Sequence, residues 1–175
     1  MIKHLRRRSL LFAIIALFVA SIALGYRADD WARFDHRSFR VIEVPGGDSV
    51  VIESAKDERE SVKLAGIDPS DLARAWLVDH AMGREVTLFL ECPQTRDASG
   101  QLQGFVFLDN QNLSVALVQA GLAYADRRQK TVMDALIDPA ETDARKKNRG
   151  LWNGLKYDQM PAWRQEWLRS LPPRR

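Results

Sequence analysis

The residue types that most often bind metals or act as nucleophiles are scarce in this chain of 175 residues. Cys92 is the single cysteine and lies in an apolar run, so no intrachain disulfide can form and we expect a small buried side chain. His4, His36 and His80 are far apart and lack the i, i+4 spacing of a metal-binding pair. The composition argues against a zinc site, and nothing in it indicates an organic or redox cofactor.

Aspartates stand at two positions where the chain is expected to turn. Asp48 ends the run Pro-Gly-Gly-Asp, and Asp68 begins the run Asp-Pro-Ser-Asp. An aspartate in such a turn either accepts hydrogen bonds from nearby backbone N–H groups or binds a ligand through its oxygens. The residues alone leave both interpretations open, and the outcome depends on the elements that position the two side chains.

Short strands are predicted around both turns. Apolar residues alternate over 39–44 and resume at 50–52, which with the glycines between them is typical of a β-hairpin. A third strand is expected over 62–67, directly before the second aspartate turn, and two more over 84–92 and 104–108. The sequence therefore offers five short strands.

Helices are predicted between and after these strands. The first begins after Asp68 or Ser70 as capping residue, the second spans 113–120 and is stopped by a glycine, and the third spans about 138–148. Three strands, a helix, two strands and then helices is the element order of a five-stranded OB barrel, an α+β fold with a mostly β core and about three helices. Periodicity alone leaves several other α+β folds open.

Charge is distributed unevenly along the chain. The formal net charge is +3, and residues 1–8 contribute four basic side chains and no acidic one. Residues 9–126 hold 10 basic and 17 acidic side chains, whereas residues 127–175 hold 12 basic and 6 acidic ones. The strand-rich part therefore repels polyanions, and a basic groove for phosphates would have to come from the C-terminal third or from local clustering.

The N-terminal segment is typical of export across a membrane. Basic residues at positions 3 and 6–8 precede an apolar run over 10–26, which is long for a cleaved signal peptide and short for a transmembrane helix. Residues 1–27 are therefore interpreted as a signal peptide or a membrane anchor. Because basic flanks stay cytoplasmic, we expect the rest of the chain, joined through a polar tether over 28–37, in the periplasm or outside the cell.

Four sequence motifs occur in one order between residues 39 and 152. They are Val41-x-x-Val44-x-Gly46-Gly47-Asp48-Ser49, Lys63-Leu64-Ala65-Gly66-Ile67-Asp68, Leu113 to Tyr124 (LSVALVQAGLAY) and Ala140-Glu141-x-x-Ala144-Arg145-x-x-x-x-Gly150-Leu151-Trp152. Each is weak alone, but four in register resemble the staphylococcal nuclease (thermonuclease) family over about two-thirds of the chain. The resemblance implies an OB-fold domain over 38–153 and calcium-dependent cleavage of phosphodiesters in DNA and RNA.

The resemblance also implies a calcium site. The family holds Ca²⁺ with two aspartates and a backbone carbonyl, which fall on Asp48, Asp68 and the carbonyl of Pro69. Oxygen donors of this kind suit a hard cation. Calcium is therefore the cofactor that the resemblance implies, provided that the two aspartates bind metal rather than backbone groups.

Three positions that the resemblance assigns to catalysis carry a different residue. The glutamate that activates water falls on Asp71, which is one methylene shorter, and the first phosphate arginine falls on Lys63, which lacks the planar fork. The second arginine falls on Gln101, and the loss of such a cation lowers a rate by roughly 10³ or more. The resemblance thus implies a degenerate phosphodiesterase site.

Two functions stay open from the sequence. One is a weak or altered calcium-dependent nuclease outside the cytoplasm; the other is a catalytically inactive OB-fold module, a pseudoenzyme, that binds nucleic acid, a protein or another partner at the cell envelope. The tail over 154–175 carries tryptophans and leucines at helical spacing. We expect it to pack back on the barrel as an amphipathic helix rather than to contact a membrane or a partner, and we expect a monomer.

Overall fold

The computed structural model describes residues 29–54, 56–91 and 95–172. The predicted export segment over 1–27 and Cys92 lie outside this part, so the expectations for them stay predictions. Within the described part, no helix is long and apolar enough to cross a membrane.

The chain divides into two compact units, residues 1–35 and residues 36–175. In the first unit, residues 29–34 are helical. The second unit holds the described strands and every candidate site residue.

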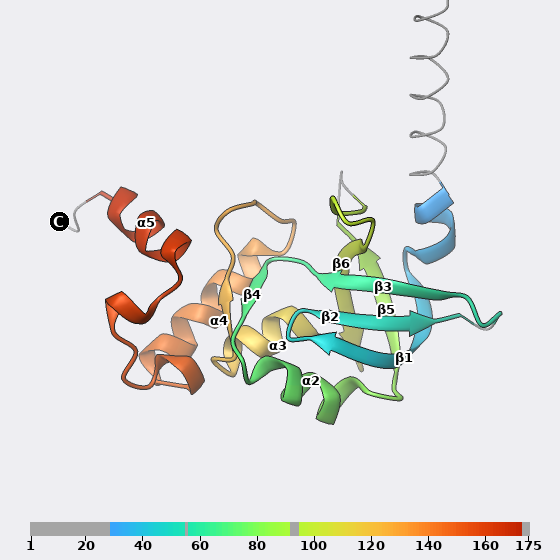
Figure 1. Ribbon diagram of the computed structural model, residues 1–175, viewed down its shortest axis with the longest axis horizontal. Coiled ribbons are helices and arrows are strands. Elements are labelled where there is room, and N and C mark those ends of the chain that lie inside the picture. Colours follow the sequence, from blue (N-terminus) through green and yellow to red (C-terminus); the bar gives the residue numbers. More distant parts are fainter. Residues whose placement is uncertain (1–28, 55, 92–94, 173–175) are drawn as a thin grey trace, which may run out of the picture. The chain divides into compact units, whose positions relative to one another are not determined.

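A closed barrel of five strands forms the core of the second unit (Figure 1). The strands are β1 (Arg37–Gly46), β2 (Ser49–Glu53), β3 (Arg59–Leu64), β5 (Glu85–Leu90) and β6 (Leu102–Leu108). They pair in the order β3-β2-β1-β5-β6, and parallel pairing of β3 with β6 closes the barrel. A short strand, β7 (Gln111–Asn112), extends the sheet beyond β6. The predicted five-stranded OB barrel, its hairpin included, is confirmed.

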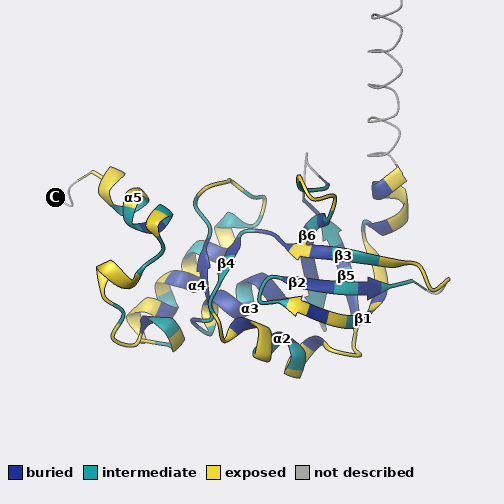
Figure 2. Cartoon of the chain, in the orientation of Figure 1, coloured by how far each residue is buried: buried dark blue, intermediate teal, exposed yellow. Residues whose placement is uncertain are grey.

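Alternation of apolar and polar residues explains why the strands close around one core. Along β1 the buried side chains are Phe39, Val41 and Val44, and along β2 they include Val50 and Ile52. Figure 2 shows buried residues gathered on the barrel strands and on the elements beside them. Each such side chain contributes roughly 1.5–3 kcal/mol when fully buried, so this pattern is the main source of stability.

The third predicted strand is two strands in the structure. β3 ends at Leu64, and the separate strand β4 (Ile67–Pro69) pairs antiparallel with β8 (Ala123–Ala125) rather than with the barrel. The break falls at Gly66, whose φ of +78° is a conformation that favours glycine. A Cβ at Gly66 would also lie 2.6 Å from Cδ1 of Ile137. The prediction of one continuous strand is wrong because a glycine turn redirects the chain at this point.

The three predicted helices are present, with changes at their starts. They are α2 (Ala73–Ala81), α3 (Leu113–Gln119) and α4 (Asp134–Lys146). No side chain caps α2, because the Ser70 hydroxyl instead donates to the Leu122 carbonyl at 2.7 Å. α3 is capped by Asn112, whose Oδ1 accepts from the backbone of Ser114 and Val115. α4 begins four residues before its predicted start.

The C-terminal tail is helical as predicted, but it packs on β8 and α4 beside the barrel rather than on the barrel strands. Two short 3₁₀ helices, η1 (Gly150–Trp152) and η2 (Tyr157–Gln159), lead to α5 (Ala162–Ser170). Trp163 of α5 packs against the cluster of Tyr124, Ala144 and Trp152. The tail therefore contacts β8 and α4, which lie beside the barrel in Figure 1.

Candidate functional site

The turn that carries Asp48 packs against the segment that carries Asp68. A Cβ at Gly47 would lie 2.8 Å from Cβ of Pro69 and 3.0 Å from Cβ of Ala73, so only glycine allows the β1–β2 turn to approach β4 this closely. The Asp48 carbonyl also accepts a hydrogen bond from the backbone N–H of Leu64 at 2.7 Å. The fold thus brings together the segments of the candidate metal ligands Asp48, Asp68 and Pro69.

Asp48 is paired with Lys63 across the β2–β3 ladder. Lys63 lies opposite Ser49 in the antiparallel register, and its Nζ is 3.6 Å from Asp48 Oδ2. Both side chains are partly exposed, so this single pair contributes little to stability. The pair does have an electrostatic effect, because the positive charge of Lys63 already compensates the Asp48 carboxylate.

Both oxygens of Asp68 accept hydrogen bonds from the C-terminal third of the chain. Oδ1 accepts from Nη2 of Arg128 at 3.1 Å, and Oδ2 accepts from the indole Nε1–H of Trp163 at 2.9 Å. Tyr124 lies opposite Asp68 in the β4–β8 pair, and burial raises the pKa of its hydroxyl, which keeps it neutral. Asp68 is therefore more fully satisfied than Asp48.

Arg128 lies on the loop between β8 and α4 and is held from three sides. Its Nε and Nη2 donate to the carboxylate of Asp126 at 2.9 and 2.8 Å, and its guanidinium lies 5.0 Å from the ring centroid of Trp163. The hydrogen bond to Asp126 raises the pKa of Arg128 above its ordinary value. Its Nη1 donates to no other residue in the described ranges, so one edge of the guanidinium stays available to a ligand.

Two of the predicted catalytic residues lie apart from these pairs. Asp71 is exposed in the turn before α2, and its side chain bonds to no other residue that the structure describes. Gln101 precedes β6, and its Nε2 donates to the hydroxyl of Ser61 at 2.7 Å. Gln101 thus makes a structural contact across the parallel β3–β6 pair.

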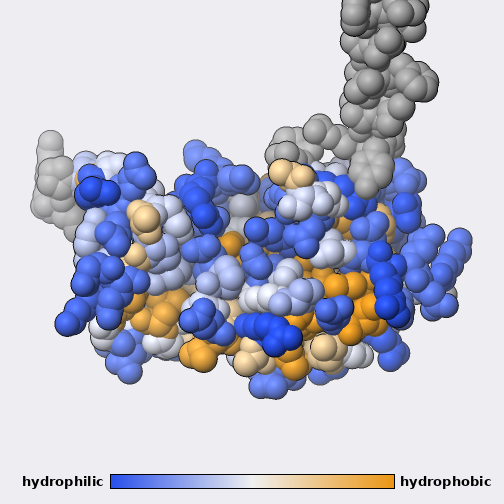
Figure 3. Space-filling view, viewed as in Figure 1, coloured by the Kyte–Doolittle hydropathy of each residue, from blue (hydrophilic) through white to orange (hydrophobic). Residues whose placement is uncertain are grey.

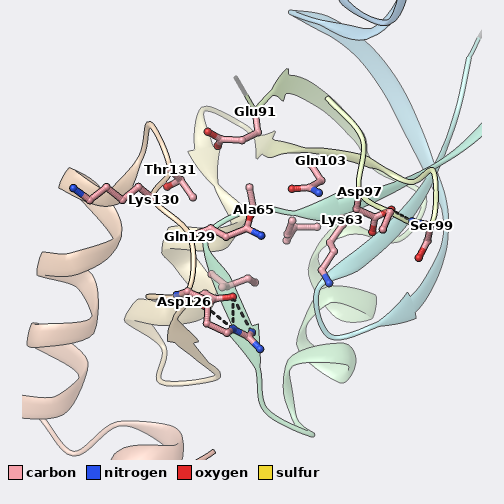
Figure 4. Close-up of a pocket in the computed structure, with 15 residues that line it drawn as sticks. Lys63, Ala65, Glu91, Asp97, Ser99, Gln103, Asp126, Gln129, Lys130 and Thr131 are labelled. Carbon is pink, nitrogen blue, oxygen red and sulfur yellow. Dashed lines mark hydrogen bonds and ion pairs between the residues drawn. The ribbon is translucent and has the colours of Figure 1, made fainter. Parts of the chain in front are cut away.

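A pocket of about 510 Å³ opens beside Arg128 (Figure 4). Lys63, Asp97 and Ser99 lie on one side of it, and the loop that carries Gln129 and Thr131 lies on the other. Its remaining polar lining residues are Glu91, Gln103, Asp126, Arg128 and Lys130. Of the six candidate site residues, Lys63 alone lines the pocket.

In Figure 3, hydrophilic residues cover most of the upper part of the domain, whereas hydrophobic ones gather in its lower half.

The pocket is lined by equal numbers of basic and acidic side chains. Arg128 and Lys130 come from the C-terminal third and Lys63 from the barrel, and the acidic residues are Glu91, Asp97 and Asp126. Figure 4 shows Lys130 extending outward from the pocket.

The residues that the resemblance assigns to calcium do not fit a resident ion as they are paired. Arg128 bonds to Oδ1 of Asp68 and Trp163 bonds to Oδ2, while Lys63 pairs with Asp48. A cation at this site would have to compete with these three groups. Among the described residues, no group of three or more His, Cys, Asp or Glu side chains is arranged to hold a metal. The calcium ligands therefore stay a prediction from the resemblance.

A closed five-stranded barrel with helices on one side and a polar pocket at its edge defines an OB-fold domain. The model of the staphylococcal nuclease homologues matches residues 55–154 of the chain, and the chain belongs to that family. The match includes Lys63, Asp68 and Gln101, whereas Asp48 lies before its first residue. No curated protein matches the chain.

Sequence reasoning missed Arg128 and Trp163 as residues of this site. Arg128 stands in the basic run over 127–130, and Trp163 belongs to the tail predicted to pack back on the barrel. Neither signal indicates Asp68 as the partner, which lies 60 residues from Arg128 and 95 from Trp163 in the chain.

Proposed function

We propose that the chain binds single-stranded nucleic acid through its phosphates and hydrolyses phosphodiester bonds slowly, in a calcium-dependent reaction. The observation that carries this proposal is that Lys63 and Arg128, from opposite halves of the domain, line one pocket beside Asp68. Family membership supports a nucleic-acid ligand, because members of this family cleave DNA and RNA.

The pocket suits one nucleotide of a single strand. Its volume of about 510 Å³ lies in the usual range of small-ligand pockets. Nη1 of Arg128, which bonds to no other residue in the described ranges, can donate a hydrogen bond to a phosphate oxygen, and Lys63 adds a point charge. Gln103 and Gln129 carry amide groups that can bond to the edges of an unstacked base.

Slow hydrolysis follows from what the other positions carry. Asp71 is exposed and can take a proton from water, but it is shorter than a glutamate. The amide of Gln101 bonds to Ser61 and supplies no positive charge at the phosphate. Lys63 forms an ion pair with Asp48, and this carboxylate reduces the attraction of the Lys63 ammonium group for a phosphate. Weak charge stabilisation of the transition state is therefore expected.

A non-catalytic binding module is the alternative function. The pairing of both candidate metal aspartates with basic side chains favours it, because such pairing compensates the carboxylates without metal. The basic and apolar segment over 1–27 supports action outside the cytoplasm, with a membrane or envelope partner, for either function.

Binding and cleavage of a fluorescent single-stranded oligonucleotide by the purified chain test the proposal. We expect binding that weakens with rising salt, and at least tenfold weaker binding for both Lys63→Gln and Arg128→Gln. Arg59→Gln is the matched control, since the Arg59 side chain is 69% exposed at the other end of β3 and, among the described residues, forms its one ion pair with Glu53. Equal binding by all three variants would contradict the pocket as the nucleic-acid site.

Cleavage of the same oligonucleotide separates the two functions. With calcium added, we expect slow product formation that stops on addition of a chelator and is lost in Asp71→Asn. Binding without any cleavage, at every calcium concentration, would favour the non-catalytic module.

A further inference from the structure

We propose that helix α5 competes with divalent cations for Asp68, so that the C-terminal tail lowers the affinity of this carboxylate for a metal ion. The competing groups are the indole N–H of Trp163 and the guanidinium of Arg128. This proposal concerns cation binding and does not rest on the binding of nucleic acid.

The contact between Trp163 and Asp68 is specific rather than a consequence of general packing. The indole Nε1 lies 2.9 Å from Asp68 Oδ2, which is the distance of a good hydrogen bond to a charged acceptor. The centroid of the Trp163 ring lies 5.0 Å from Cζ of Arg128. It lies 6.4 Å from the ring centroid of Tyr124, and the two rings meet edge to face. Trp163 therefore both bonds to Asp68 and positions the second group that bonds to it.

α5 is anchored to the strand that pairs with β4. Arg164 is 1% exposed, and its Nη2 lies 2.6 Å from Oε2 of Glu141. Its Nη1 donates to the carbonyl of Ala125, whose N–H donates to Glu141 at 2.9 Å. Ala125 lies opposite Ile67, the residue before Asp68, in the β4–β8 pair. The anchor thus fixes Trp163, the neighbour of Arg164, at a short distance from Asp68.

A cation that binds Asp68 competes with Trp163 and Arg128 for the carboxylate oxygens, and the positive charge of Arg128 also repels it. Hydrogen bonds to charged groups are among the stronger ones in proteins, and the loss of one such competitor corresponds to roughly tenfold in an equilibrium constant. The N–H of Trp163 can be removed without removing its ring, because phenylalanine retains an aromatic face beneath Arg128. Trp163→Phe should therefore bind calcium about tenfold more tightly than the natural chain.

The test is titration calorimetry of the full chain with Ca²⁺ alone, in the absence of nucleic acid. Trp163→Phe is compared with Trp167→Phe, which makes the same change on the same helix at a ring that contacts Arg127 and Arg164 but not Asp68. Asp68→Asn in the Trp163→Phe background assigns the bound ion to this carboxylate. Thermal unfolding of each variant confirms that the domain is folded.

We expect tighter calcium binding in Trp163→Phe alone, and its loss when Asp68→Asn is added. Equal affinities in the two tryptophan variants would overturn the proposal, as would tight binding that survives Asp68→Asn. If no variant binds calcium at millimolar concentration, α5 does not compete with a cation for Asp68 and the proposal is also wrong. Failure of oligonucleotide binding would leave these outcomes unchanged, so the two proposals can fail separately.

Discussion

The barrel and the C-terminal region of this domain are stabilised in different ways. The barrel encloses apolar side chains, and Val41, Ile52 and Phe105 are at most 1% exposed. The C-terminal region instead buries charge, since Arg164 is 1% exposed and its partner Glu141 is 3% exposed. A buried guanidinium and carboxylate must stay together, because either one alone in the interior is costly.

The candidate site lies where these two regions meet, and it shares the properties of both. On the barrel side, Asp48 and Lys63 form a partly exposed pair at 3.6 Å. On the C-terminal side, Asp68 accepts two hydrogen bonds from residues that belong to the tail and the loop before α4. The chemistry of the site therefore depends on a region that lies largely outside the closed barrel.

Restoring the three substituted positions should produce the largest effect. A Lys63→Arg, Asp71→Glu, Gln101→Arg variant should cleave single-stranded DNA roughly 10³-fold faster with calcium, because it regains both guanidinium forks and the longer carboxylate. The measurement is the initial rate on a labelled oligonucleotide. Asp48→Ala in the same background should abolish the gain, and an unchanged rate would show that the residue mapping is wrong.

Breaking the buried pair should cost the C-terminal region most of its stability. Arg164→Met leaves Glu141 buried with Arg127, at 3.4 Å, as its remaining cation among the described residues, and we expect the free energy of unfolding to fall by about 3 kcal/mol. Urea denaturation measures the change. Lys63→Met is the control, for which we expect a loss of less than about 1 kcal/mol, since its pair is partly exposed. Equal losses would contradict the contrast between the two regions.

The barrel could be predicted from the sequence because its signals are local. Alternating apolar residues and the glycine turn at 46–47 specify the β1–β2 hairpin without information from distant residues. The break at Gly66 could not be predicted, because residues 62–67 (VKLAGI) contain one glycine and no other residue typical of a turn. Its cause is the packing of Gly66 against Ile137, which comes from a helix far along the chain.

The site could be predicted in part for the same reason. Asp48 lies in the turn directly before β2 and Lys63 lies on the neighbouring strand β3, so motif spacing is enough to place them together. The partners of Asp68 could not be predicted, because an arginine and a tryptophan in a basic, tryptophan-rich third have many possible acceptors. Only the pairing of β4 with β8 and the anchoring of α5 bring them to this carboxylate.

Neutralising the two aspartates one at a time should sharpen the comparison between them. Asp68→Asn should lower the free energy of unfolding by about 1–2 kcal/mol, since Arg128 and Trp163 lose a charged acceptor. Asp48→Asn should lower it by less than about 0.5 kcal/mol, since Lys63 returns to solvent. Urea denaturation of both variants measures the two losses. A larger loss for Asp48→Asn would contradict our conclusion that Asp68 is the more firmly held carboxylate.

The smallest effect should come from the surface of the C-terminal region at low pH. Asp143 on α4 accepts from Lys147 and Arg149, and the hydrogen bond with Lys147 holds the pKa of its carboxyl below the ordinary value of 3.8. A lowered folded-state pKa contributes stability that is present above pH 3.8 and is lost as the pH falls below it. Melting temperatures between pH 3 and 6 should therefore decline slightly less steeply in Asp143→Asn than in the natural chain. Because the carboxylate is solvent-accessible, a steep difference between the two would mean that Asp143 acts through the buried charges rather than at the surface.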